Sequence, residues 1–185
     1  MRERFLDDIF SNRANAAILS RWRELELRDG WLVAGCLFQT VWNRRAGLAP
    51  DAHMRDHDVF YFDPTDLTEA AERAVQARVE AALADLGVVV EAKNQARVHL
   101  WYAAHFGFPY PRLSSTRDAI DRFIVRSTCV GVRPAGRSWE VYAPYGLDDL
   151  YAGRLDPNPL IDHRPLFEAK ARSYAARWPW LRIDV

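Results

Sequence analysis

The sequence has few cysteines, no excess of charge of either sign and no long apolar run. Its two cysteines, Cys36 and Cys129, do not show the paired spacing of a zinc site. Lysine plus arginine number 25, as do aspartate plus glutamate, so the formal net charge is zero. This balance argues against a broad basic surface for nucleic acid. We therefore expect neither a zinc protein nor one that binds nucleic acid through its overall charge.

Membrane and export signals are also missing. No apolar stretch approaches the ~20 residues that a membrane-spanning helix needs, and residues 1–8 are too strongly charged for a signal peptide. The sequence shows no internal repeat, low-complexity tract or interdomain linker. With 185 residues, 49% of them hydrophobic and 12% aromatic, the chain is expected to form one cytoplasmic domain over residues 1–185.

The spacing of apolar residues predicts helices mixed with short strands along the chain. Asp66 and Glu69 form a capping-box pattern at the start of one helix, and Gly87 marks its end. In chain order we expect two short helices within 3–27, a strand or helix entry over 31–34, a helix over 35–43, a strand over 56–62, a helix over 66–86, strands over 88–92 and 96–102, a helix over 115–126, a β-hairpin over 128–143, a helical turn over 147–151 and a last helix capped by Asp162.

The most informative stretch is Asp56-His57-Asp58, which leads into the strongly β-prone run Val59-Phe60-Tyr61-Phe62. Side chains alternate faces along a strand, so Asp56 and Asp58 point the same way and His57 points the other way. Two carboxylates held this close repel each other unless a cation lies between them, and oxygen-rich sites suit Mg²⁺ or Mn²⁺. The pair therefore indicates a divalent-metal site for phosphate chemistry, although Asp-x-Asp also occurs as a turn former.

Two further features support this hypothesis. Glu91, near the end of the apolar run 88–90, can join the two aspartates if the two strands lie side by side. Upstream, Gly35 and Cys36 are small residues between an apolar stretch and a predicted helix, where a backbone can approach a phosphate and a helix N-terminus adds N–H donors. Taken singly, Glu91 is interpreted as an exposed charge at a strand end, and Gly35 as a turn glycine.

The order of these motifs resembles that of the nucleotidyltransferase superfamily, which has the polymerase-β-like fold: a glycine-small pair opening a helix, Asp-x-Asp on a strand, and one acid on a following strand. Longer strings resemble a bacterial family of nucleotidyltransferase-like proteins, and the resemblance runs from about Leu19 to Leu181. These strings are Gln39-Thr40-Val41-Trp42-Asn43, Phe60-Tyr61-Phe62-Asp63, Asn94-Gln95-Ala96-Arg97-Val98-His99-Leu100-Trp101-Tyr102 and Ala143-Pro144-Tyr145-Gly146-Leu147-Asp148-Asp149-Leu150.

The resemblance implies an α+β (mixed α/β) fold, with a small mixed sheet and helices packed against it. It implies that Asp56, Asp58 and Glu91 are the catalytic, metal-binding acids, with Mg²⁺ or Mn²⁺ as cofactor and a nucleoside triphosphate as substrate. Gly35 and Cys36 would cradle the nucleotide phosphates. The sequence departs from the pattern at two positions: Cys36 replaces the usual serine, and His57 is polar where an apolar residue is usual.

Arg97 follows Glu91 closely in the sequence, and its role is open between a bidentate phosphate contact and a structural salt bridge. The function also has alternatives. The favoured one is transfer of a nucleoside monophosphate to an acceptor hydroxyl that the sequence does not identify. A non-catalytic nucleotide or metal sensor of the same fold and a metal-dependent phosphohydrolase would use the same acids, whereas a purely structural interaction protein would show no divalent-metal effect.

Overall fold

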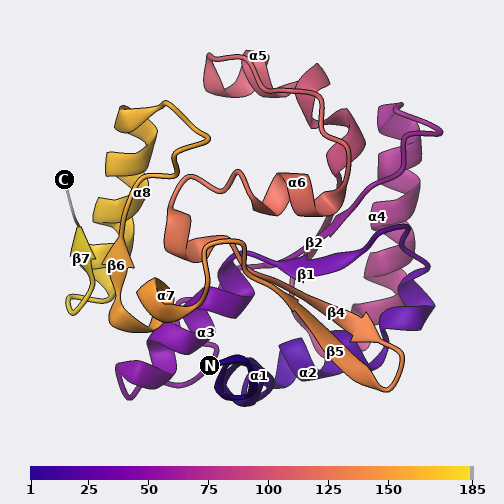
Figure 1. The fold of residues 1–185 in the computed structure, drawn as a ribbon. Helices are drawn as coiled ribbons and strands as arrows, with labels where there is room; N and C mark the ends of the chain where they lie inside the picture. Colours follow the sequence, from indigo (N-terminus) through magenta and orange to yellow (C-terminus); the bar gives the residue numbers. More distant parts are fainter. Residues whose placement is uncertain (184–185) are drawn as a thin grey trace.

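A computed structural model of the protein describes residues 1–183, and its centre is a five-stranded sheet in the order β3-β2-β1-β4-β5 (Figure 1). The neighbours β2 and β3 are parallel, whereas the other three pairings are antiparallel. The fold is therefore α+β with a small mixed sheet, as predicted. The strands are β1 (Trp31–Val33), β2 (His57–Tyr61), β3 (Val90–Asn94), β4 (Gly131–Ala135) and β5 (Ser138–Tyr142), and a separate parallel pair is formed by β6 (Arg154–Leu155) and β7 (Arg182–Ile183).

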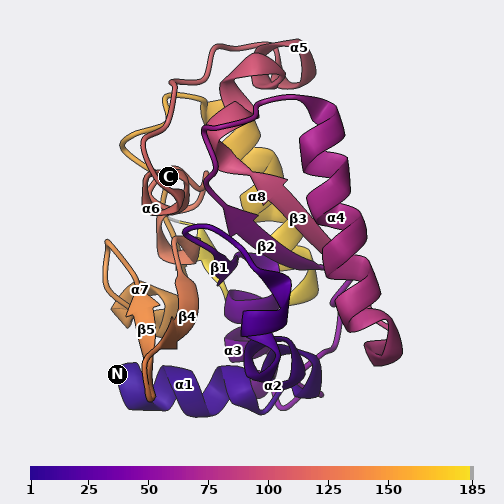
Figure 2. The ribbon, with the colours of Figure 1, turned by 90° about the vertical axis from the view of Figure 1, so that its right-hand side faces the viewer.

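Helices surround this sheet, and α4 and α8 lie on opposite sides of it (Figures 1 and 2). None of the helices in residues 1–183 is long and apolar enough to cross a membrane. The α-helices are α1 (Arg2–Phe10), α2 (Arg13–Ser20), α3 (Gly35–Arg45), α4 (Glu69–Leu83), α5 (Tyr102–Phe106), α6 (Thr116–Ile120), α7 (Asp148–Ala152) and α8 (Arg164–Arg177), and the 3₁₀ helices are η1 (Trp22–Leu25), η2 (Ala84–Leu86), η3 (Gln95–Leu100) and η4 (Arg126–Thr128).

The two faces of the sheet belong to two apolar clusters, because successive side chains of each strand point to opposite faces. Leu32 of β1 and Val59 of β2 join the larger cluster, which includes Val79 of α4. Trp31 and Val33 of β1 join a smaller cluster with α6. The alternation along β1 and β2 thus separates the face covered by α4 from the face covered by α6, and the buried residues of α8 also belong to the larger cluster.

The C-terminal end of α8 is fixed against α3 by aromatic side chains. Trp178, directly after α8, is completely buried and meets Trp42 of α3 edge-on at 5.2 Å between ring centroids. Its indole N–H donates to Asn43 Oδ1 at 2.8 Å. Edge-to-face aromatic pairs contribute ~0.5–1.5 kcal/mol beyond their buried area. This anchor fixes the C-terminal end of α8 against the last turn of α3.

The strand predicted over residues 96–102 is wrong. This segment is the 3₁₀ helix η3, followed by the beginning of α5. The reason is the side chain of Asn94, which accepts from Ala96 N at 3.1 Å and also bonds to the backbone N–H and C=O of Asp63. An Asn side chain that caps the following turn ends a strand locally, whatever the β propensity of the residues after it.

Other helix boundaries differ from the prediction for similar local reasons. Helix α4 begins at Glu69 with Thr68 as its N-cap, and Asp66 instead accepts from the Thr68 N–H. The last helix is capped by His163, whose Nδ1 accepts from Leu166 N, and not by Asp162. Helix α6 ends at Ile120, well short of residue 126. The predicted β-hairpin, the helix that begins at Gly35 and the helical turn near 147–151 are confirmed.

Candidate active site

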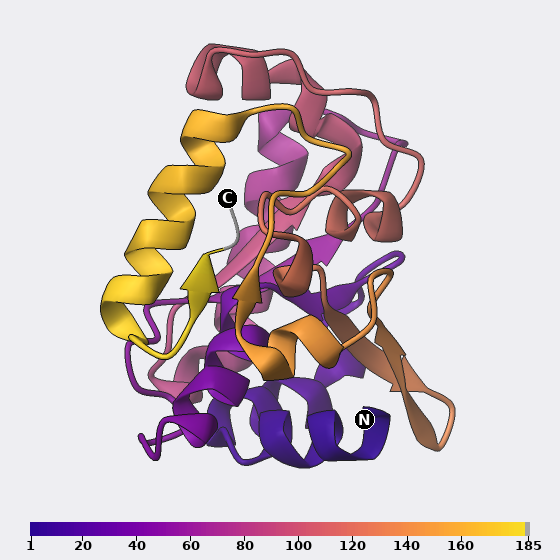
Figure 3. The same ribbon diagram turned by 60° about the vertical axis from the view of Figure 1, so that its left-hand side comes forward.

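A cavity of about 820 Å³ lies over the sheet, lined by the start of α3, β2, β3, the η3–α5 segment, the α6 region and one face of α8. In Figure 3 the α8 side is turned forward, with α5 above it. Asp56, Asp58, Glu91 and Gly35 all line this cavity. The structure therefore brings together the acids and the glycine that the sequence had placed far apart along the chain.

The sheet register explains why the acids meet. Asp58 of β2 lies directly opposite Glu91 of β3 in the parallel pairing, and directly opposite residues of neighbouring strands share a face. Asp56 comes just before β2 and also lines the cavity. His57, between the aspartates, is buried on the other face with 3% exposure. The predicted alternation of Asp56, His57 and Asp58 is confirmed by this arrangement.

Asp58 has the most informative electrostatic environment of the three acids. Burial raises the pKa of its carboxyl to about 7, and the negative charges of Asp56 and Glu91 add to this rise. Lys170 and Lys93 oppose the rise with their positive charges but do not cancel it. A buried carboxylate crowded by like charges is stabilised by a cation beside it. A cation bound at the cavity floor is therefore expected to be stabilised more strongly than one bound at an ordinary acidic surface.

This donor set fits a divalent metal ion that is bound jointly by the protein and a substrate, rather than by protein ligands alone. Within residues 1–183, no three His, Cys, Asp or Glu side chains are close enough together to hold a metal ion by themselves. Mg²⁺ typically binds through one or two carboxylates and takes its remaining ligands from substrate phosphates and water. The hard oxygens of Asp56 and Asp58 would supply that protein share, with Glu91 beside them.

His57 is the second departure that the sequence showed, and the structure places it in the core. Neither of its ring nitrogens has a hydrogen-bond partner within the described residues. Burial lowers the pKa of its imidazole, so the ring is neutral at pH 7. His57 packs behind the strand that carries the aspartates and does not line the cavity.

Gly35 and Cys36 differ in what they present to the cavity. Gly35 lines it, whereas Cys36 is fully buried and its Sγ donates to Val33 O at 3.2 Å. Burial raises the pKa of the Cys36 thiol well above its usual value, so the side chain is a neutral core group. The expected phosphate cradle is therefore limited to the backbone at the very start of α3, because the N–H of Leu37 already donates to Ala34 O at 3.1 Å.

The space beside Gly35 is taken by a side chain of its own helix. A Cβ atom at this position would lie 2.6 Å from Nε2 of Gln39, one turn further along α3. The residue before it, Ala34, has φ = +60°, a strained conformation for a residue with a side chain. The turn from β1 into α3 is thus tight and brings the Gln39 amide over the glycine.

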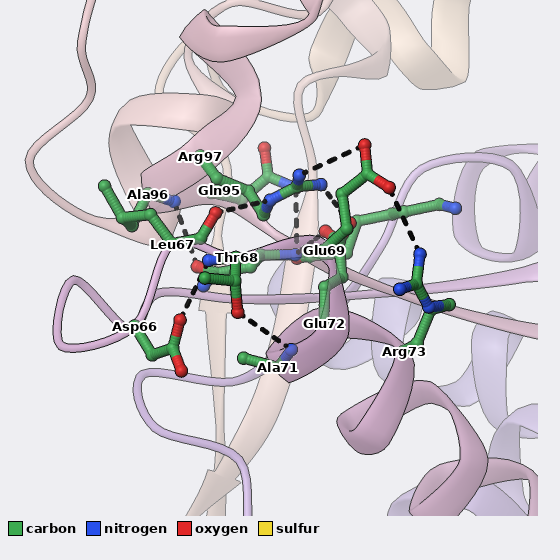
Figure 4. Close-up of polar contacts among 12 residues, drawn as sticks. Asp66, Leu67, Thr68, Glu69, Ala71, Glu72, Arg73, Gln95, Ala96 and Arg97 are labelled. Atoms are coloured by element: carbon green, nitrogen blue, oxygen red, sulfur yellow. Dashed lines mark hydrogen bonds and ion pairs between the residues drawn. The ribbon is translucent and has the colours of Figure 1, made fainter.

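The structure assigns Arg97 to a salt bridge, the structural alternative of the two considered. Figure 4 shows its guanidinium directed at the start of α4: Nη1 pairs with Glu72 of α4, and Nε donates to the O atom of Leu67, which precedes α4, at 3.1 Å. Arg97 is 7% exposed and does not line the cavity. The expected phosphate contact rested on a strand at 96–102 that does not form, so Arg97 is not placed where a phosphate in this cavity would meet it.

Sequence reasoning missed the basic residues that line the cavity. They are Arg55, Lys93, Arg122, Lys170 and Arg177. Of these, Lys93 forms an ion pair with Glu91 at 3.7 Å. Lys170 and Arg177 of α8 could have been found from the sequence. The cavity-lining residues of α8 recur at helical spacing, and they are Leu166, Lys170, Ser173, Tyr174 and Arg177. A basic residue two turns from another along one apolar stripe is unusual on a core-facing helix.

The mixed sheet, the paired aspartates at its parallel edge and the glycine turn define a protein of the nucleotidyltransferase class. The model of the family described as Nucleotidyltransferase matches residues 20–183, and the chain belongs to this family. A solved structure described as a CCA-adding enzyme head domain has a TM-score of 0.80 and 27% sequence identity, and the match covers 98% of this chain and 95% of the other. A search among curated proteins gives no match.

Proposed function

We propose that the protein is a metal-dependent nucleotidyltransferase that moves a nucleoside monophosphate from a nucleoside triphosphate to an acceptor hydroxyl. The observation that carries the proposal is the Asp58–Glu91 pair on the cavity floor, with Asp56 beside it and the pKa of Asp58 raised to about 7. Carboxylates crowded in this way are stable when a cation joins them. The family and the fold support transfer of a nucleotidyl group as the reaction.

The residues have separate tasks in this reaction. Asp56 and Asp58 would hold Mg²⁺ or Mn²⁺, which supplies positive charge to the phosphate oxygens and to the leaving group. Glu91 takes the proton of the acceptor hydroxyl as general base, or shares in binding a second ion. The acceptor oxygen then forms a bond to the α-phosphorus while the bond to pyrophosphate breaks, and pyrophosphate leaves with the electron pair.

The walls of the cavity suit the rest of a nucleotide. Trp101, Tyr102, Phe106 and Tyr110 line it, and the rings of Tyr102 and Tyr110 are stacked at 4.2 Å between centroids. Aromatic side chains stack on the planar face of any base, with a contribution of ~1–3 kcal/mol per base. This wall supports a nucleoside triphosphate as the donor without favouring one base.

One experiment separates this proposal from its two alternatives. The protein is incubated with an α-³²P-labelled nucleoside triphosphate, Mg²⁺ and candidate acceptors, and label transfer and pyrophosphate release are followed. An oligonucleotide with a free 3′-hydroxyl is tested first, because the similar solved structure is described as the head domain of a CCA-adding enzyme. Small hydroxylated metabolites follow. The matched inactive control is Asp58→Asn.

Each outcome selects one function. Labelled acceptor in the wild type and none with Asp58→Asn supports the transferase. Phosphate release without a labelled product, dependent on Asp58, indicates the phosphohydrolase. Binding of nucleotide and metal without any turnover indicates the sensor. In that case the thiol of Cys36, which is buried and bonded to Val33 O, would account for the loss of a phosphate contact.

A further inference from the structure

Lys170 and Arg177 of α8 and Arg55 before β2 form a second cluster of like charges in the cavity, here called the α8 cation cluster. Within residues 1–183, none of the three forms an ion pair with a carboxylate. By contrast Arg122, which also lines the cavity, pairs with Asp118. The cavity thus contains an acidic group on the sheet and an unpaired basic group on α8.

These cations lie close enough to repel one another. The pKa of Lys170 is lowered by burial, and the charge of Arg177 lowers it further, against the attraction of Asp58 and Asp56. The pKa of Arg177 is lowered by burial and also by the charge of Arg55. A fold that holds three cations together without acid partners gains stability when an anion binds between them. The three acids on the sheet show the opposite case, in which a bound cation relieves the repulsion between carboxylates.

Arg177 is held in place by contacts that leave part of its guanidinium available. Its Nε donates to Ser173 O at 3.2 Å, and its Nη1 donates to Gln39 Oε1 at 3.3 Å. Its guanidinium carbon lies 4.6 Å from the ring centre of the buried Trp178. Within the described residues, Nη2 makes no hydrogen bond, and a fixed guanidinium with free donors suits a phosphate.

Gln39 connects this arginine to the turn at the start of α3. Its Oε1 accepts from Arg177, and its Nε2 occupies the space where a side chain at Gly35 would begin. The side-chain amide of Gln39 therefore lies between Arg177 and Gly35, the first residue of α3. Gly35, Gln39 and the α8 cation cluster all line the same cavity.

We propose that the α8 cation cluster, with Gln39 beside it, binds the polyphosphate tail of the nucleoside triphosphate. Arg177 contacts the phosphate oxygens through its free Nη2, and Lys170 and Arg55 neutralise their charge. The α-phosphate then lies toward Asp56 and Asp58, and the β- and γ-phosphates lie along α8. The same donors bind inorganic tripolyphosphate without a divalent metal. This assignment rests on the proposed function for the identity of the nucleotide, but not for the presence of a polyphosphate site.

Calorimetric titration with inorganic tripolyphosphate, in EDTA and again in Mg²⁺, tests the site directly. We expect wild-type protein to bind in both conditions, with an affinity that falls as NaCl is raised. Lys170→Gln and Arg177→Gln each weaken binding about tenfold or more. Arg172→Gln is the matched control, because Arg172 lies on the same helix, is 72% exposed in its side chain and pairs with Glu168; it leaves affinity unchanged. Arg177→Lys keeps the charge and restores part of the affinity.

Titration of the same variants with a nucleoside triphosphate and Mg²⁺ separates the two proposals. Tripolyphosphate binding that depends on Lys170 and Arg177, without any nucleotide binding in the wild type, supports the site and counts against the transferase. Nucleotide binding that is equally tight in wild type, Lys170→Gln and Arg177→Gln overturns the site and leaves the transferase standing. Wild-type protein that binds no tripolyphosphate in either condition also overturns it. Circular dichroism confirms that each variant is folded.

Discussion

Asp58 and Glu91 stand opposite each other in the one parallel pair of the five-stranded sheet, and both face the same cavity. Burial, with the negative charges of Asp56 and Glu91, raises the pKa of Asp58 to about 7, a cost that the folded chain carries at neutral pH. A destabilising pair of this kind at a cavity floor is typical of a functional site.

The first prediction concerns Asp58→Asn. The substitution removes a carboxylate that burial and two neighbouring acids disfavour, so we expect a gain in unfolding free energy of ~1–3 kcal/mol at pH 8 without metal. Any extra stabilisation by Mg²⁺ with nucleotide should disappear. Thermal melting measures both effects. Asp7→Asn, an exposed aspartate with the same chemical change, is the control and should alter neither. A less stable Asp58→Asn protein would mean that the carboxylate is structural.

The second prediction concerns pH. Because the folded pKa of Asp58 is raised from 3.8 to about 7, the folded state holds a proton that the unfolded state has released between those values. The contribution of Asp58 to stability therefore falls as pH rises from about 4 to about 7. The stability difference between Asp58→Asn and wild type should grow over this interval and level off above it.

Metal competes with the same proton, so the Mg²⁺-dependent melting shift should increase from pH 6 to pH 8. A pH-independent shift would contradict this assignment.

The third prediction concerns Arg97. Removing this largely buried arginine leaves Glu72 without its partner, and breaking such a pair costs ~3–5 kcal/mol. Urea denaturation of Arg97→Ala measures that loss. Arg73→Ala is the control, because the Arg73–Glu69 pair is 71% exposed on both sides and such pairs contribute ~0.3–0.5 kcal/mol. Nucleotide affinity of folded Arg97→Ala should equal that of wild type. A selective loss of affinity would restore Arg97 to the phosphate site.

The fourth prediction concerns Gly35→Ala. The new methyl group meets only the flexible end of Gln39, so we expect stability to change by less than ~1 kcal/mol, since alanine is also the better helix former. The displaced amide should lose its contact with Arg177, and nucleotide affinity should fall about tenfold. Adding Gln39→Ala to Gly35→Ala should cause little further loss, which a double-mutant cycle of affinities would show. Fully additive losses would contradict the link between the two residues.

Much of the site could be predicted from the sequence because its signals are local. The alternation of Asp56, His57 and Asp58 is a property of any strand, and the structure confirms which of them faces the core. The position of Glu91 beside Asp58 required a pairing of two strands, which the resemblance to a known family supplied. The strand register that aligns these two acids becomes visible only in the structure.

The failures had equally specific causes. The segment containing Arg97 has strand-like residues, but the Asn94 side chain turns the backbone before they can pair. Lys170 and Arg177 lie about eighty residues or more beyond Glu91 in the sequence, and their place in the cavity depends on the docking of α8 through Trp178 onto α3. Because this position depends on tertiary packing, the sequence shows only a weak helical periodicity that indicates it.

Thermal melting against Mg²⁺ or Mn²⁺, with and without each nucleoside triphosphate, tests the central claim most directly. A ligand at ~100 times its dissociation constant adds about 2.7 kcal/mol, or ~5–11 °C for a chain of this size. The account predicts a rise with metal and nucleotide together that exceeds the sum of the rises with either alone, and that is absent in Asp58→Asn. The absence of a shift with every pair, or an equal shift in Asp58→Asn, would contradict it.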